Sequence, residues 1–324
     1  AFSMSDYNGG PIDEAYLSKR LRNEPLVEIT QAKGTSETHP FLSKNDEWAG
    51  FEAVTNHPGE KILSNLTGSY VRDAYLQGLT LQDQGKPNPF NFGVIGSSDT
   101  HVGGGSYTEE THFSKIGLLD GEPYLRGSVP FDGIYSLIAR LWQPDSILEI
   151  DKKNYLSFSP RLIRFGSSGL AGVWAEENTR ESIYNAFRRK ETFGTSGPRI
   201  KVRFFAGYNF ENSNLNDSNL IQEAYSKNIP MGGDLIQEKD EIPKFLVWAI
   251  SDPLGAPLER IQIIKGWLAE GEQMEKVFDV ACSDGQSVNS QTHRCPDNNA
   301  QVNLDDCSIN RDKGDAEIKT FWQD

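Results

Sequence analysis

Short hydrophobic segments separated by polar turns characterise the first half of the chain. Residues 26–30 and 92–96 have the length and the apolar or β-branched composition of buried strands. Between them, apolar positions on one side predict a helix that begins at Ser69 and ends at Gly78, because glycine readily adopts the left-handed conformation of a helix end. A strand, a long crossover with a helix and a second strand imply that the two strands pair in parallel.

Two further helices are predicted before the hydrophobic periodicity changes. Apolar residues at i, i+3, i+4 and i+7 predict one over residues 132–143, and a start resembling a capping box predicts another over residues 178–190. From Pro198 onward apolar and polar positions alternate, which is typical of antiparallel strands with one buried face. These strands are expected at residues 200–204, 245–250, 261–265 and 277–280.

The length of the chain agrees with this division. At roughly 100–200 residues per domain, 324 residues favour two compact units. We expect an α/β unit over residues 1–197, a small antiparallel β domain over residues 198–281 and a polar, cysteine-containing tail over residues 282–324. The longest apolar runs are strand-sized, far below the roughly 18 apolar residues of a membrane span, so no span is expected.

The charge and the cysteine content limit which classes of ligand and which cellular compartments are expected for this protein. With 32 basic and 46 acidic residues, the formal net charge is −14. Such a surface repels phosphate backbones, so we expect a small-molecule substrate and no nucleic acid. Cys282, Cys295 and Cys307 lie in one polar segment, where a disulfide and free thiols are both open alternatives and the odd number leaves one cysteine over. A disulfide would indicate a periplasmic or extracellular protein.

The clearest chemical feature is Asp99-Thr100-His101, which directly follows the second predicted strand. Side chains two residues apart in an extended chain point to the same side. The carboxyl ends of parallel strands are where α/β folds build their sites, and carboxylate and imidazole are ligands for ions such as zinc or manganese. In the competing interpretation Asp99 caps the next turn and His101 faces solvent.

Longer blocks of the sequence resemble known families. Residues 96–101, Gly-Ser-Ser-Asp-Thr-His, are similar to the last metal motif of the PHP (polymerase and histidinol phosphatase) superfamily. Together with residues 22–40 and 171–199, they resemble a large bacterial family of unknown function with a PHP-like core, over about residues 6–281. The resemblance implies part of a distorted (β/α) barrel that binds divalent ions and hydrolyses phosphoesters.

The same resemblance implies particular ligands. It makes Asp99 and His101 metal ligands and places a third histidine shortly after the strand that holds Glu28, where His39 fits. From the residues alone, a structural or exposed His39 is equally consistent with its turn-like surroundings. Glu28 lies mid-strand among apolar neighbours, so its carboxylate should meet a cation or hydrogen-bond donors, and we expect it to support the ligands. PHP proteins open with a His-x-His pair that this chain lacks, so the chain resembles a C-terminal portion and its own N-terminal fragment is a possible partner.

Several other residues are weaker candidates. His112, after Glu109 and Glu110, is a possible general acid or base, or a solvated loop histidine. Arg180 and Arg199 could clamp a phosphate, or could form surface salt bridges. Acidic and amide residues near Cys307 suggest a calcium-stiffened loop, although their spacing departs from the EF-hand rule; they are Asp305, Asp306, Asn310, Asp312 and Asp315.

Two functional hypotheses follow from the sequence. The first is a metal-dependent hydrolase of PHP type that acts on a phosphoester through metal-activated water, with Asp99, His101 and His39 as ligands. The second is a non-catalytic secreted or envelope binding protein with an incomplete metal site, which the missing His-x-His pair favours. To decide between the two hypotheses, one must know where the side chains of the residues after the second predicted strand lie in the folded protein.

Overall fold

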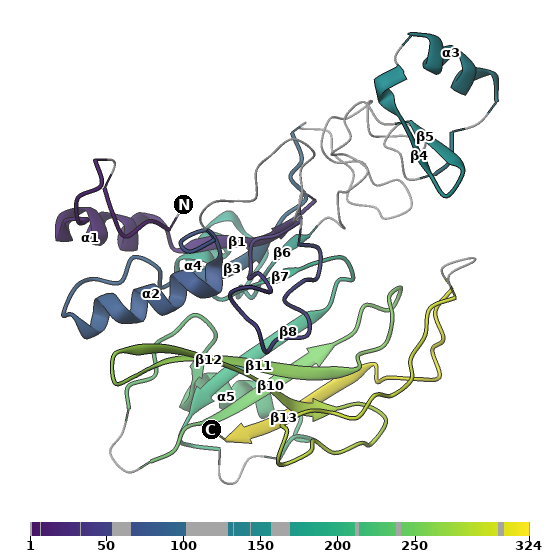
Figure 1. Ribbon diagram of the computed structural model, residues 1–324. Helices are drawn as coiled ribbons and strands as arrows, with labels where there is room; N and C mark the ends of the chain where they lie inside the picture. The colour runs from purple at the N-terminus through teal and green to yellow at the C-terminus, as the bar shows by residue number, and fades with distance from the viewer. Residues whose placement is uncertain are drawn as a thin grey trace.

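The computed structural model has a short parallel strand pair at the centre of its N-terminal half (Figure 1). In it β1 (Leu26–Gln31) pairs in parallel with β3 (Gly93–Gly96) and antiparallel with β2 (Gly34–Thr35), so the parallel pairing predicted from the sequence is confirmed. The structure describes residues 2–6, 8–32, 34–53, 66–101, 129–131, 133–142, 144–156, 169–210, 214–237, 241–303 and 308–323.

Two helices lie next to this sheet. In α1 (Glu14–Asn23), Asp13 caps the first turn by accepting a hydrogen bond from the Tyr16 amide. The crossover helix α2 (Val71–Asp83) continues past Gly78, where the sequence predicted its end. Gly78 instead allows close packing, because a side chain at this position would collide with the Asn88 side chain. A hydrophobic core joins α1 and α2 to the aromatic residues before β3; its buried members are Phe2, Leu17, Val71, Ala74, Leu81, Phe90 and Phe92.

A separate strand pair lies beside this sheet on the β3 side. Strands β6 (Leu170–Val173) and β7 (Thr192–Thr195) pair antiparallel, with α4 (Arg180–Arg188) inserted between them. The Thr192 hydroxyl donates to the Val94 carbonyl at 2.9 Å, which places β7 along β3. A Cβ on Gly96 would lie 2.5 Å from the Thr195 carbonyl oxygen, so glycine permits the close approach. The strand ends of β1, β3 and β7 therefore lie at one edge.

The C-terminal half is antiparallel, as predicted from its alternating pattern. Its main sheet has the order β13-β10-β8-β9, and a long hairpin of β11 and β12 packs against it. Its edge strand β13 comes from the polar tail, where the sequence pattern predicted no strand. The elements are β8 (Lys201–Gly207), α5 (Leu220–Lys227), β9 (Ile229–Pro230), β10 (Lys244–Ile250), β11 (Arg260–Ala269), β12 (Glu272–Cys282) and β13 (Glu317–Gln323).

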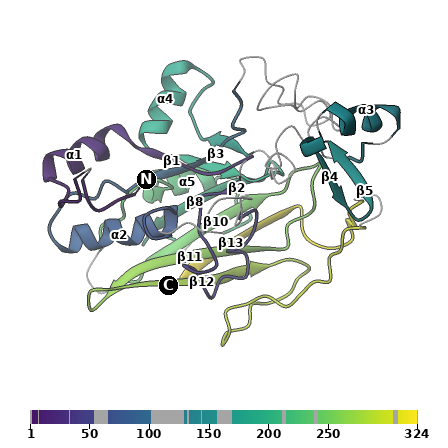
Figure 2. The ribbon, with the colours of Figure 1, turned by 45° about the horizontal axis from the view of Figure 1, so that its top comes forward.

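A small lobe projects from the rest of the molecule in both views (Figures 1 and 2). It consists of α3 (Ile134–Trp142), a 3₁₀ turn (Pro144–Ser146) and the hairpin of β4 (Ile147–Ile150) and β5 (Lys153–Leu156). The predicted helix is confirmed, but its apolar face is exposed, with Trp142 83% accessible. Among the described helices, none has the length and apolar character to cross a membrane.

The expected (β/α) barrel of PHP type is wrong. The described residues form one three-stranded sheet, one four-stranded sheet and three strand pairs, and these do not close into a barrel. A (β/α) barrel requires parallel strands that alternate with helices all the way round. Among the described strands, only β1 and β3 pair in parallel, and the described strands that follow them form antiparallel pairs, so the repeat on which closure depends is not continued there.

Candidate functional site

The segment after β3 is fastened to both neighbouring strands. The Ser97 amide donates to the Thr30 carbonyl of β1 at 3.0 Å, and the Gly169 amide before β6 donates to the Ser97 carbonyl at 2.9 Å. Ser97 also donates its hydroxyl to the carboxylate of Glu28, so this half-buried acid has the donor that the sequence led us to expect. Residues 97–101 thus leave the sheet from a fixed position.

Asp99 and His101 are brought together by a turn and not by an extended strand. Asp99 has a φ of 56°, in the left-handed region, which redirects the chain. The His101 Nδ1 lies 2.6 Å from the Asp99 carbonyl oxygen and 3.6 Å from Asp99 Oδ1. Because a carbonyl oxygen only accepts hydrogen bonds, Nδ1 is the donor in this contact, and in the neutral ring Nε2 then keeps its lone pair. The His101 side chain is 56% exposed, whereas that of Asp99 is 11% exposed.

This arrangement fits part of a metal site. A histidine that ligates a metal usually donates its other ring N–H to a carbonyl or carboxylate, and His101 does so. Asp99 Oδ1 lies 3.6 Å from Nδ1, the ring nitrogen that makes this hydrogen bond. Within the described ranges, no three His, Cys, Asp or Glu side chains gather closely enough to hold a metal ion. The described residues therefore offer two donors at this edge.

His39 belongs to a different part of the structure. Its ring is buried against Phe41 and Tyr70, with ring centroids 5.1 and 5.6 Å away. The Phe41 amide donates to His39 Nδ1 at 3.2 Å, so in the neutral ring Nε2 carries the proton and neither nitrogen offers a lone pair. The structure does not group His39 with Asp99 and His101. The His39 ring instead accepts a hydrogen bond within the turn that begins at residue 39.

The two arginines lie at different edges of the sheet. Arg199 follows β7, whose end adjoins the end of β3, and its amide donates to the Asp252 carboxylate at 2.7 Å. This bond is the main reason that the pKa of Asp252 lies below its usual range. Because β6 runs antiparallel to β7, the chain leaves β6 toward Arg180 from the opposite edge. His112 lies outside the described residues.

The tail contains a disulfide but no calcium-like cluster among its described residues. Cys282 and Cys295 are bonded, with Cα atoms 5.6 Å apart, which confirms the disulfide alternative for these two; Cys307 lies outside the described residues. Asp315 accepts from the Asp284 amide at 3.1 Å, and Asp284 accepts from a nearby glycine amide. These carboxylates accept hydrogen bonds from backbone amides and so stabilise turns of the tail. Asp305 and Asp306 also lie outside the described residues.

Sequence reasoning missed a second polar cluster, centred on Arg72. Its guanidinium binds Glu37 through Nε at 2.9 Å and Asp46 through Nη1 at 2.6 Å. A signal was present: Arg72 borders the apolar side of the predicted helix, next to Val71 and Tyr75, where a partly buried arginine requires partners. The partners themselves are not predictable from spacing, since Glu37 lies 35 residues away.

Comparison with known proteins identifies a family but no activity. The whole chain, residues 1–324, matches the family described as "Protein of unknown function (DUF3604)", and the chain belongs to this family. No curated protein and no solved structure matches it. The resemblance to a family of unknown function is thereby confirmed, and these comparisons do not show a PHP-like core.

Proposed function

We propose that this member of the DUF3604 family is a metal-dependent hydrolase of phosphoesters. Asp99 and His101 would hold a divalent ion of the zinc or manganese type at the carboxyl edge of β3. The observation that supports the proposal is the hydrogen bond from Nδ1 of the exposed His101 side chain to the Asp99 carbonyl, which in the neutral ring leaves Nε2 with its lone pair. A divalent ion bound there would lower the pKa of a water ligand and polarise a phosphoryl oxygen.

The surrounding residues have supporting roles in this proposal. The Glu28–Ser97 hydrogen bond and the Ser97–Thr30 backbone bond hold the segment that carries both donors. Arg199, which follows the adjacent strand end, would neutralise charge on a bound phosphoryl group. His39 is left out of the ligand set because its Nδ1 is occupied. Further donors would come from outside the described residues, where His112 remains a candidate acid or base.

The test combines metal analysis with turnover. We expect the purified protein, supplied with Zn²⁺ or Mn²⁺, to hydrolyse p-nitrophenyl phosphate, and His101→Ala and Asp99→Asn to lower both metal content and turnover, the latter about 10–100-fold or more. Asp312→Asn, an exposed carboxylate of the tail, is the matched control and should change neither quantity. If both site variants keep full metal content and turnover, the assignment fails.

A non-catalytic binding protein is the second candidate. The observation that favours it is the lack of a three-donor group within the described part of the chain. In that case added metal would produce no turnover in wild type or variants. For either function we propose a periplasmic or extracellular location, which the Cys282–Cys295 disulfide supports because such bonds persist in oxidising compartments.

A further inference from the structure

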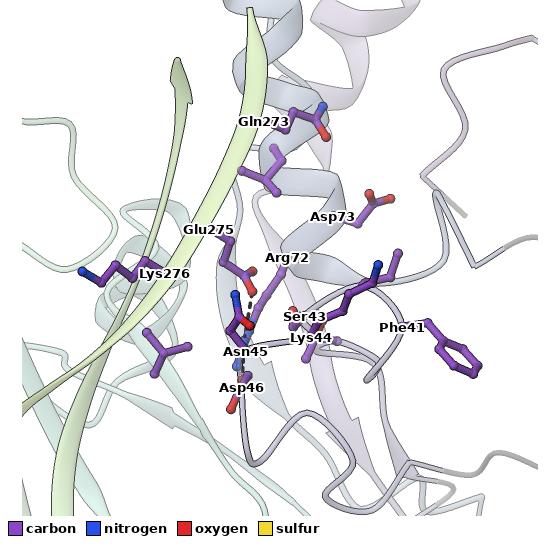
Figure 3. A pocket seen from close by; sticks show the side chains of 14 residues that line it. Phe41, Ser43, Lys44, Asn45, Asp46, Arg72, Asp73, Gln273, Glu275 and Lys276 are labelled. Atoms are coloured by element: carbon purple, nitrogen blue, oxygen red, sulfur yellow. Dashed lines mark hydrogen bonds and ion pairs between the residues drawn. The ribbon is translucent and has the colours of Figure 1, made fainter. Parts of the chain in front are cut away.

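A hollow of about 420 Å³ lies away from the Asp99–His101 pair, which does not line it. It is bounded by the turn of residues 38–46, the start of α2 and the middle of β12. Figure 3 shows side chains from all three elements around this space, with Arg72 and Asp46 at its base. Three segments that are far apart in sequence therefore build one site.

The base of the hollow is held together by ion pairs between one arginine and several carboxylates. Arg72 Nη1 donates to Asp46 Oδ2 at 2.6 Å and lies 3.7 Å from Glu275 Oε1, while its Nε donates to Glu37. The Arg72 and Asp46 side chains are only 12% and 3% exposed. Burial alone would lower the pKa of Arg72, but Glu37 and Asp46 outweigh it and raise the pKa above its usual value. The guanidinium is thus committed to carboxylates of the protein.

The charges of the hollow disfavour an anionic ligand. Lys276 directs its amine over the Phe278 ring, 4.5 Å from the centroid, and Figure 3 shows it pointing away from the other labelled side chains. Lys44 is a further cation of the lining, but the carboxylates of Asp46, Asp73 and Glu275 outnumber Lys44 and Arg72, so a phosphate or sulfate would meet net negative charge. A metal ion is disfavoured as well, since no three-donor group exists among the described residues. A neutral molecule fits the site better.

The remaining polar groups suit a ligand with many hydroxyls. No described residue bonds to the side-chain amide of Asn45, whose backbone carbonyl is held by Arg294 at 3.0 Å. Gln273 donates to the Thr80 hydroxyl at 3.0 Å, which leaves its Oε1 as an acceptor. Glu275 adds further acceptors. The hollow thus offers both donors and acceptors, as hydroxyl groups require, because each hydroxyl both donates and accepts.

An aromatic ring lies at the rim. Phe41 is 69% exposed, and the buried ring of His39 lies behind it at 5.1 Å. The bond from the Phe41 amide to His39 Nδ1 fixes the turn that presents this ring. A solvent-exposed aromatic face, with its negative quadrupole, attracts the C–H-rich face of a sugar ring. An exposed aromatic ring beside a hollow lined by hydrogen-bonding groups is a combination that suits carbohydrate.

We propose that this hollow binds a neutral saccharide. One sugar ring of the saccharide stacks on Phe41, which Figure 3 shows apart from the other labelled side chains, and hydroxyls of neighbouring rings bond to Asn45, Gln273 and Glu275. The proposal goes beyond the hydrolase function and does not rest on it, because the two sites share no lining residue.

The experiment is an oligosaccharide array that carries neutral, sulfated and uronic-acid glycans, probed with the full chain in EDTA. The wild-type protein should retain neutral glycans, and calorimetry with a retained glycan should show about a tenfold or larger loss of affinity for Phe41→Ala and for Asn45→Ala. Tyr184→Ala, which removes a similarly exposed aromatic ring from α4, is the matched control and should bind like wild type.

Three outcomes would overturn the proposal: no glycan retained, retention of acidic glycans alone, or equal affinity of Phe41→Ala and wild type. Circular dichroism confirms that the variants are folded. A double variant, Asp99→Asn with His101→Ala, separates the two proposals: it should lose metal and keep glycan binding. If it loses glycan binding while folded, the hollow is not independent of the metal site and the proposal is wrong.

Discussion

At the scale of single residues, Asp279 is the most completely buried acid of the C-terminal half. Its carboxylate accepts from the Cys295 amide at 2.6 Å and the Gln262 side chain at 2.7 Å, and it lies 3.2 Å from both Arg260 and Arg294. Burial would raise its pKa, but these donors and charges lower the pKa below its usual value. The cluster joins β11, β12 and the disulfide loop.

The lowered pKa of Asp279 predicts an acid-sensitive stability. A carboxyl group whose pKa is depressed on folding stabilises the fold above its unfolded pKa of about 3.9, and this contribution is lost as pH falls through the folded pKa. At pH 7, Asp279→Asn should lower the free energy of unfolding by about 3 kcal/mol because two arginines lose their counter-charge. Urea unfolding from pH 7 to pH 3 should show a steeper decline for wild type; parallel curves would contradict this account.

Substitution of Gly96 tests whether β3 and β7 approach each other as closely as the structure shows. A Cβ at this position would lie 2.5 Å from the Thr195 carbonyl oxygen, and the strand backbone cannot move aside easily. Gly96→Ala should therefore lower the free energy of unfolding by about 1–3 kcal/mol. Gly50→Ala is the control, because its Cβ would meet only a Pro40 side-chain atom at an ordinary 3.5 Å. Equal stabilities of the two variants would mean that the strands are not so closely packed.

At the scale of elements, periodicity predicted where helices and strands occur better than where they end. The predicted stop at Gly78 was wrong because tertiary packing against Asn88, and not a left-handed turn, explains that glycine. The helix predicted over residues 132–143 is present, yet its apolar face is exposed, since a pattern specifies a face and not what covers it. The strand β13 went unpredicted because polar loops surround it.

The disulfide stabilises the loop that follows β12, which contains neither helix nor strand. Cys282 ends β12, and Cys295 lies 13 residues later and donates its own amide to Asp279. For a loop of this size the replacement of both cysteines by serine should lower the free energy of unfolding by about 3 kcal/mol. Thermal unfolding of wild type with a dithiol reductant should show a matching loss. Cys307→Ser is the control; a similar loss in that variant would point to a different pairing.

At the scale of the whole molecule, sites were predictable only where their residues are neighbours in sequence. Asp99 and His101 follow one strand, so their proximity could be inferred, although the left-handed turn at Asp99 could not. The ion pairs of Arg72 join Glu37 to Glu275, two residues more than 200 positions apart, and only the packing of α2 against β12 brings them together. The barrel was expected from resemblance, and the antiparallel hairpins after β3 exclude it.

The central claim is that Asp99 and His101 share a divalent ion, and anomalous X-ray diffraction tests it most directly. Crystals grown with Zn²⁺ would be measured on both sides of the zinc absorption edge. The account predicts an anomalous peak about 2.0–2.1 Å from His101 Nε2, with an Asp99 carboxylate oxygen at about 2.0–2.2 Å. A map in which His101 Nε2 and the Asp99 carboxylate face apart, with no peak beside either, would contradict it.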